Sequence, residues 1–271
     1  MLILLSPAKT LDFKTKPFYN KGENIIFPKE TLQIIKQIKN FSVLELKELM
    51  HISDNIAQLN YKRFQKYNSS YKNQKQDKNQ TYNFKQAIFA FAGDVYDGFD
   101  FLTYTKKDFQ SLNKQVLILS GLYGVLTPLT FIKPYRLEMG TKFLKFQNKF
   151  SRKNLYQFWG NKVTDQILKK LQRQKKEERF ILNLASQEYF KVLDKKQIQE
   201  FLIDVDFKVL KNNKLTTVAI YAKKQRGEMT NWIIKNNILN LKDLKKYKNS
   251  GFKYSAKNST NKKLVFVKKM I

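Results

Sequence analysis

Three apolar segments of this 271-residue chain end in a serine that is followed by charged or turn-forming residues. Their sequences are LILLS-PAK, LILS-GLYG and LNLAS-QEY. The carboxyl ends of parallel strands meet at one edge of an open sheet, so polar groups just beyond them favour a ligand site there. A serine at such a point also commonly caps the next turn, but the threefold repetition favours a shared site. The candidate residues are Ser6, Lys9, Ser120, Tyr123, Ser186, Glu188 and Tyr189.

Glycine is scarce in this chain, with only nine residues, and several of them fall in GDVYDG and SGLYG. Glycine is required where the backbone takes a positive φ or lies close to a ligand. Tight turns alone are the alternative explanation. If the ligand interpretation holds, Gly121 and Gly124 contact the ligand through their backbone, and GDVYDG contributes Asp94 and Tyr96.

Arginine is also scarce, with six residues against 46 lysines. A guanidinium offers a planar fork of donors that an ammonium cannot reproduce. Arg136 lies in PYRLEMG beside Glu138, and Arg226 lies with Lys223 in AKKQRG. We expect both arginines to contact a bound anion, although Arg136 and Glu138 could instead form a buried structural pair. The single histidine, His51, is interpreted as a surface or ordinary packing residue.

The composition limits the possible chemistry and partners. A net charge of +30 attracts polyanions, so nucleic acid is the leading partner class and an anionic membrane surface the second. Codons rich in A and T would produce the same excess of lysine. The chain has no Cys and one His, which excludes thiol chemistry and a zinc site of Cys and His. We predict no metal and no cofactor.

The periodicity and turn signals predict one domain over residues 1–271, an α/β mixed (α+β) fold with a mixed sheet surrounded by helices. Expected helices cover 43–50, 53–64, 105–113, 155–171, 232–238 and 241–247. Expected strands cover 2–5, 116–119 and 180–184, a hairpin of 201–210 with 215–221, and a pair of 251–254 with 264–267. Residues 68–83 are almost wholly polar and predict a mobile surface loop rather than a domain boundary. No signal peptide or apolar span is present, so we expect a cytoplasmic protein that does not bind membranes.

Several longer motifs follow one another along nearly the whole chain. They are MLILLSPAKTLDF, LMHISDNIAQLN, FAGDVYDGF, LSGLYGVLTPLTFIKPYRLEMG, LYQFWGNKVTD, LNLASQEYFK, YAKKQRGEMTNWII and LVFVKK. In this order they resemble the YaaA peroxide stress family. The resemblance implies a monomeric mixed α/β fold and DNA binding without sequence preference through a helix-hairpin-helix-like element, which would fall on residues 105–126. It also implies protection during hydrogen peroxide stress that limits damage by free iron. Because thiol and multiple imidazole ligands are missing, we expect that protection to be indirect.

Two functions therefore remain open. The first is binding of DNA, double-stranded or distorted, supported by the charge and by ten lysines against one Asp from residue 241 onward. Tyr247, Phe252 and Tyr254 lie among these lysines and could stack on exposed bases. The second is an enzyme that acts on a nucleotide or nucleobase, with N-glycosidase-like chemistry at the strand ends. Asp94, Glu138 and Lys9 are the catalytic candidates for that reaction.

Overall fold

Five parallel strands form the centre of the computed structural model, which describes residues 1–71, 76–77 and 80–269. They are β1 (Leu2–Leu5), β5 (Val116–Ser120), β8 (Ile181–Asn183), β9 (Leu202–Lys211) and β13 (Lys263–Lys269). Their order is β13-β9-β8-β1-β5, and β1 is buried along its whole length. A continuous apolar run is expected for a strand covered on both faces. All five strands therefore end at the same edge of the sheet.

Antiparallel strands extend this sheet on both sides. β6 (Gly124–Leu126) pairs with β5, and β12 (Phe252–Tyr254) and β11 (Lys248–Asn249) follow beyond β13. β10 (Lys214–Thr216) forms the predicted hairpin with β9 through Asn212 and Asn213, whose φ values are 47° and 57°. Positive φ at both central residues suits a two-residue hairpin turn. The described residues thus form a mixed nine-stranded sheet, which confirms the predicted fold class.

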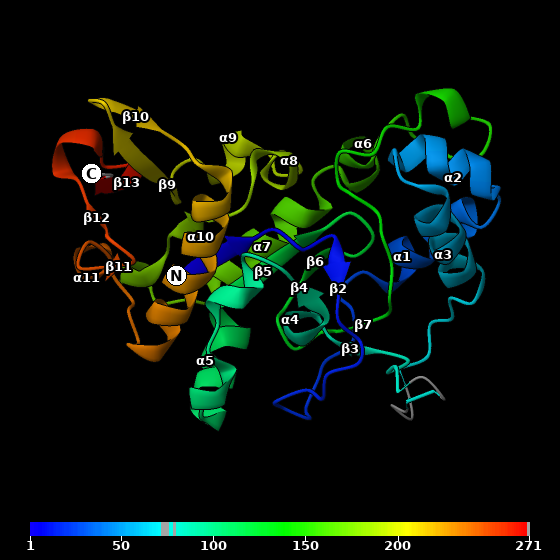
Figure 1. Ribbon diagram of the computed structural model, residues 1–271, viewed down its shortest axis with the longest axis horizontal. Coiled ribbons are helices and arrows are strands. Elements are labelled where there is room, and N and C mark those ends of the chain that lie inside the picture. The colour runs from blue at the N-terminus through cyan, green and yellow to red at the C-terminus, as the bar shows by residue number, and fades with distance from the viewer. Residues whose placement is uncertain (72–75, 78–79, 270–271) are drawn as a thin grey trace.

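Helices surround the sheet, and three of them form a separate group. Figure 1 shows α1, α2 and α3 together at one end of the molecule, with β9 to β13 at the other end. The α-helices are α1 (Pro28–Ile38), α2 (Val43–Met50), α3 (Asp54–Gln65), α4 (Ala87–Ala90), α5 (Lys106–Gln115), α6 (Leu155–Trp159), α7 (Lys162–Gln172), α8 (Gln187–Phe190), α9 (Lys195–Ile198), α10 (Ala219–Lys235) and α11 (Leu241–Leu244). The 3-10 helices are η1 (Tyr96–Gly98), η2 (Phe101–Thr103), η3 (Leu144–Phe146), η4 (Lys176–Glu178) and η5 (Ala256–Asn258).

Two smaller sheets connect the loops around this framework. β2 (Thr10–Leu11) pairs with β4 (Phe91–Ala92), and β3 (Lys85–Gln86) pairs with β7 (Phe131–Ile132), both antiparallel. The first pair fixes the chain that leaves β1 and carries Lys9. The predicted loop at 68–83 lies partly outside the described residues, and its mobility stays a prediction.

Side-chain caps fix the starts of two predicted helices. Ser42 accepts the N–H of Glu45, whose carboxylate accepts the N–H of Ser42 in return, so α2 begins with a capping box. Thr105 and Asp108 form the same arrangement at the start of α5. Each reciprocal pair satisfies two backbone donors that the first helical turn leaves free.

Four of the predicted elements differ clearly from the structure in extent or type. The helix expected over 155–171 is broken into α6 and α7, because Gly160 takes a φ of +48° that ends the first helix. The strand expected over 215–221 ends at Thr216. The helix expected over 232–238 is the last part of α10, which begins at Ala219 and ends at Lys235. The helix-hairpin-helix-like element is not formed at 105–126, where α5 leads into the β5–β6 hairpin. The apolar run after α5 is buried at every position, which suits a strand inside a sheet.

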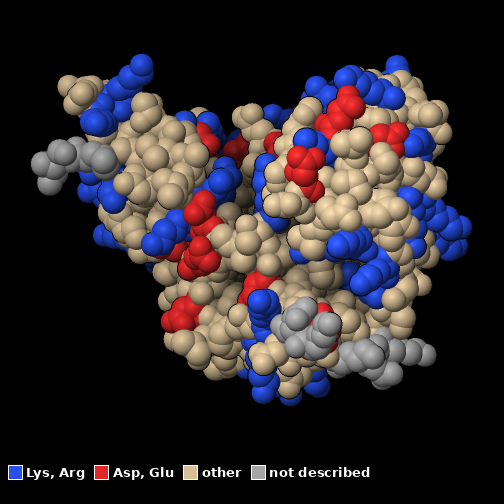
Figure 2. Space-filling view, turned by 45° about the vertical axis from the view of Figure 1, so that its right-hand side comes forward, with Lys and Arg blue, Asp and Glu red and all other residues tan. Residues whose placement is uncertain are grey.

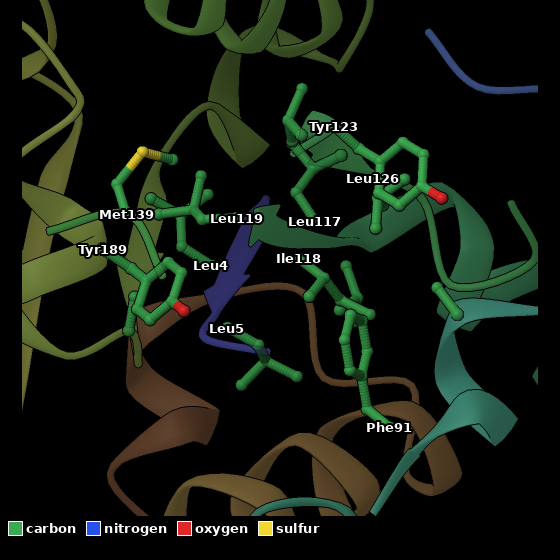
Figure 3. Packing of buried hydrophobic residues seen from close by; sticks show 14 of the residues in the cluster. Leu4, Leu5, Phe91, Leu117, Ile118, Leu119, Tyr123, Leu126, Met139 and Tyr189 are labelled. Atoms are coloured by element: carbon green, nitrogen blue, oxygen red, sulfur yellow. The ribbon is translucent and has the colours of Figure 1, made fainter. Parts of the chain in front are cut away.

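The core lies around β1 and β5. Figure 3 shows Leu4 and Leu5 of β1 among the side chains of β5, with Tyr189 and Tyr123 well apart on either side of this cluster. Tyr123 is fully buried and Tyr189 is 8% exposed. Both belong to the apolar core, although their hydroxyl groups have different surroundings.

Candidate functional site

The serines that follow β1 and β8 are in direct contact at the carboxyl edge of the sheet. Ser186 donates its N–H to Ser6 Oγ at 2.8 Å, and Ser6 Oγ lies 3.2 Å from Ser186 Oγ. Ser120, at the end of the neighbouring β5, shares a 2.7 Å hydrogen bond with the hydroxyl of Tyr135. The predicted meeting of the three serines at one edge is therefore confirmed.

Three buried tyrosines gather behind this edge. The hydroxyl of Tyr96 donates to the carbonyl oxygen of Ser6 at 3.0 Å, which ties η1 to the end of β1. Burial raises the pKa of Tyr96 well above its ordinary value, and the neighbouring Tyr135 and Tyr189 raise it further. Burial likewise raises the pKa of Tyr189, whose surroundings include Tyr135, Glu188 and Glu138. Burial raises the pKa of Tyr135 as well, so all three hydroxyls stay neutral and act only as hydrogen-bonding groups at ordinary pH.

Glu138 is held between two cations. Lys9 Nζ lies 2.7 Å from its Oε2, and Arg136 Nη2 lies 3.1 Å from its Oε1. Arg136 is mostly covered, with 18% of its side chain exposed, and its buried Nε has no hydrogen-bond partner. The Arg136–Glu138 pair that the sequence left open as a structural contact is thus present. It retains a free donor beside the sheet edge, and such a donor suits an anionic ligand.

A second carboxylate borders the same place. Glu188 accepts the N–H of Gly140 at 3.0 Å, and Glu138 and Glu188 together line a cavity of about 350 Å³. The opposite wall comes from the end of α2, including His51, which takes the left-handed conformation with φ 50°. Two carboxylates and an imidazole around one cavity could bind a polar substrate or transfer protons.

Asp94 and Lys223 meet where the residues just before η1 approach α10, and Arg226 lies on the same helix. Lys223 Nζ lies 3.6 Å from Asp94 Oδ2. A Cβ atom on Gly227 would lie 1.7 Å from the carbonyl oxygen of Val95, so only glycine permits this approach. Burial lowers the pKa of Arg226 and the carboxylate of Asp206 opposes that shift, while the Nε of Arg226 is buried without a hydrogen-bond partner. Arg226 thus also offers an unused donor.

Several predicted ligand contacts are buried inside the protein, which corrects the sequence interpretation. Tyr123 is fully buried, and its hydroxyl accepts the N–H of Lys133 instead of contacting a ligand at the shared site. Ser120 is also fully buried and accepts the N–H of Tyr123. Gly121 and Gly124 are needed for packing, because a Cβ would lie 2.4 Å from the oxygen of Leu137 or 2.8 Å from the ring of Trp159.

Sequence reasoning missed three residues of this region. Tyr135 joins β5 to the site through Ser120, and Tyr156 donates its hydroxyl to the carbonyl oxygen of Glu188 at 2.9 Å. Tyr135 adjoins Arg136 in the motif PYRLEMG, so its position in the chain was a usable signal. His51 was interpreted as an ordinary surface residue, but it lines the cavity. Its spacing along the chain gave no sign of this, because only the tertiary fold brings the end of α2 opposite Glu138 and Glu188.

Positive charge is spread widely over the surface. Figure 2 shows lysines and arginines across the visible face, interrupted by smaller acidic groups around a hollow between two raised parts. Thirteen basic residues form ion pairs in the described part of the chain, so most cations have no carboxylate partner there. The net charge of +30 is thus largely available to an external polyanion.

One group of these lysines follows the last strands of the sheet and is named here the C-terminal lysine surface. It consists of the exposed Lys242, Lys245, Lys246, Lys248, Lys253, Lys257, Lys262, Lys263 and Lys269. Tyr247 and Phe252 are buried beneath it, so the expectation that they stack on bases is wrong. Tyr254 is partly exposed, with Lys245 Nζ 5.5 Å from its ring centre.

The described ranges contain neither a grouped set of metal ligands nor a helix that could span a membrane. Among residues 1–71, 76–77 and 80–269, no three His, Asp or Glu side chains are grouped closely enough to hold a metal ion. The helices of these ranges include none that is long and apolar enough to cross a membrane.

The fold and the sheet edge define a mixed α/β protein with a polar, arginine-containing site beyond parallel strands. Its sequence matches the family model described as peroxide stress protein YaaA over residues 1–258, and the chain belongs to this family. A UPF0246 protein from Polynucleobacter necessarius is 42% identical over 267 residues, 98% of each chain. UPF0246 proteins from Shewanella halifaxensis and Rickettsia bellii are each 40% identical over 99% of this chain and 99% and 100% of their own lengths. Family membership supports a role in peroxide stress.

Proposed function

We propose that this protein acts in peroxide stress by binding DNA without sequence preference, and that it limits iron-dependent damage by protecting the DNA itself. The observation that carries the proposal is the C-terminal lysine surface, where nine exposed ammonium groups outnumber the two carboxylates paired with them, Asp243 with Lys246 and Asp206 with Lys263. Lysine side chains bind phosphates as point charges and do not read base edges. Such contacts provide affinity with little dependence on sequence.

The contact is proposed to be formed by strands and loops rather than by a helix-hairpin-helix element. Lys248 and Lys253 lie opposite each other on the antiparallel strands β11 and β12, and Lys257 follows in η5. Lys242 lies in the first turn of α11 on the same stretch. This spacing presents several cations in succession, as a phosphate backbone requires.

A charge-removal experiment tests this proposal. The variant with Lys242, Lys248, Lys253 and Lys257 changed to Gln is compared with one carrying Gln at Lys14, Lys16, Lys106 and Lys107, which are also exposed. Fluorescence anisotropy with a labelled 20-base-pair duplex measures affinity at fixed ionic strength. We expect at least a tenfold loss for the first variant and a much smaller loss for the second. Equal losses would mean that net charge alone governs binding, and the proposed surface would be wrong.

The cavity beside Glu138 and Glu188 favours a second function, an N-glycosidase-like enzyme acting on damaged nucleotides or bases. In that reaction water attacks the sugar carbon, the base leaves, and a carboxylate accepts or supplies a proton. Duplex and single-stranded DNA containing oxidised bases are incubated with the protein, and abasic sites are counted by alkaline cleavage. The Glu138→Gln variant should lose activity and the exposed Glu177→Gln variant should keep it. Absence of abasic sites with the wild-type protein would argue against this alternative.

A further inference from the structure

A large basic cavity lies away from the site beyond the strands. It has a volume of about 670 Å³ and lies between the loop at 19–26, the end of α5 and the second half of α7. β5 begins directly after α5, so this cavity borders the opposite, amino edge of the parallel sheet. Neither Ser6 nor Glu138 contributes to its walls.

Five cationic side chains line this cavity against one carboxylate. The cations are Lys21, Lys114, Lys169, Lys170 and Arg173, and the carboxylate is Glu23. Within the described residues none of the five cations lies within 4.0 Å of a carboxylate oxygen. Several unpaired cations around one concave space attract an anion with more than one charge.

The hydrogen bonds of Glu23 and Lys170 explain why the cations of this cavity form no ion pair with Glu23. Glu23 accepts hydrogen bonds from Asn113 Nδ2 at 2.8 Å and from the hydroxyl of Thr127 at 2.9 Å, so both of its oxygens are occupied by neutral donors. Lys170 Nζ donates to the carbonyl oxygen of Asn113 at 3.1 Å. This bond fixes the ammonium beside the last turn of α5 and leaves its other protons available.

Lys170 carries its charge in a largely covered position. Burial is the main cause that lowers the pKa of Lys170 to about 8; Glu23 only partly opposes this shift, and Arg173 contributes to it. An anion placed between Lys170 and Arg173 would compensate both charges and restore the ordinary protonation. The same cavity has an apolar part formed by Tyr19, Ile26 and Leu129.

We propose that this cavity is a binding site for a nucleoside polyphosphate, separate from the DNA-binding surface. Lys169, Lys170 and Arg173 contact the phosphates, with the fork of Arg173 suited to two oxygens of one group. The base packs against Tyr19 and Leu129. The cavity volume falls within the ordinary range for small-ligand sites. The protein thereby senses or retains a nucleotide, and the C-terminal lysine surface remains free to bind DNA.

Calorimetric titration tests this with three probes: ATP, inorganic tripolyphosphate and adenosine. We expect ATP to bind at micromolar concentration, tripolyphosphate at least tenfold more weakly, and adenosine more weakly still. The Lys170→Gln/Arg173→Gln variant should lose ATP affinity at least tenfold, because it removes two charge-assisted contacts. The Lys253→Gln/Lys257→Gln variant should keep ATP affinity and serves as the matched control.

The outcomes separate this site from the DNA proposal. Equal affinity for ATP and tripolyphosphate would overturn the nucleotide assignment, and no ATP binding up to 1 mM, roughly −4 kcal/mol, would overturn the site. If Lys170→Gln/Arg173→Gln weakened duplex DNA binding as much as ATP binding, the cavity would be part of the DNA surface. Circular dichroism of each variant identifies misfolding. If the double variant is unfolded, the single Lys170→Met variant is tested in its place.

Discussion

The contact between Gly98 of η1 and Gly227 of α10 predicts that Gly227→Ala strongly destabilises the fold. An added Cβ at position 227 would lie 1.7 Å from the carbonyl oxygen and 2.7 Å from the carbonyl carbon of Val95. Both are backbone atoms, so a rotamer change cannot relieve the clash and η1 must move away from α10. Overpacking of this kind costs about 1–3 kcal/mol, and a backbone clash belongs at the upper end. Alanine is intrinsically better than glycine in a helix by about 1 kcal/mol, so helix propensity alone predicts the opposite sign.

Thermal and urea unfolding measure this effect. A loss of about 3 kcal/mol should lower Tm by roughly 6–12 °C in a chain of this size. Ile220→Ala serves as the control, because Ile220 lies on the same helix and is 58% exposed. It should change Tm by no more than about 2 °C. A Gly227→Ala protein as stable as the wild type, or more stable, would show that η1 and α10 do not meet as described.

The remaining predictions concern charge, geometry and capping. Lys170→Met should raise the free energy of unfolding at pH 7 by roughly 1–3 kcal/mol, because it removes an ammonium whose pKa is 10.5 in the unfolded chain but about 8 in the fold. The same difference makes the stability of the wild-type protein rise between pH 8 and 10.5, and the variant should lack this rise. If urea unfolding showed the same pH dependence of stability for both proteins from roughly pH 7 to 10.5, the prediction would be wrong. Arg136→Lys should abolish protection of cells from peroxide while leaving duplex affinity nearly unchanged, because an ammonium cannot reproduce the guanidinium beside Glu138; full protection by the folded variant would refute a specific role. Ser42→Ala should lower stability by about 1 kcal/mol through loss of the capping box with Glu45, and an unchanged Tm would show that α2 needs no cap.

The elements that local chemistry specifies were predictable from the sequence. Ser42 and Thr105 fixed the starts of α2 and α5, since their side chains satisfy donors within three residues. Asn212 and Asn213 located the β9–β10 hairpin, because both tolerate positive φ. The meeting of the strand ends followed from their apolar runs and from the geometry of parallel sheets.

Features that depend on distant parts of the chain could not be predicted in the same way. Gly124 suggested a ligand contact, but the ring of Trp159, 35 positions later, explains why no side chain fits there. Tyr123 resembled a site residue until its hydroxyl was found to accept the N–H of Lys133 inside the core. His51 was set aside although it lines the cavity. In each case a partner remote in sequence decides the role.

The central claim, that the protein binds DNA through phosphate contacts made by the C-terminal lysine surface, is tested most directly by the salt dependence of duplex binding. Each phosphate contact contributes about 0.9 to the slope of log affinity against log salt concentration. The account predicts a steep negative slope for the wild-type protein, the same for duplexes of different sequence. It also predicts a slope smaller by about 3–4 when Lys242, Lys248, Lys253 and Lys257 are changed to Gln. Binding that does not change with salt, or an identical slope for that variant, would contradict it.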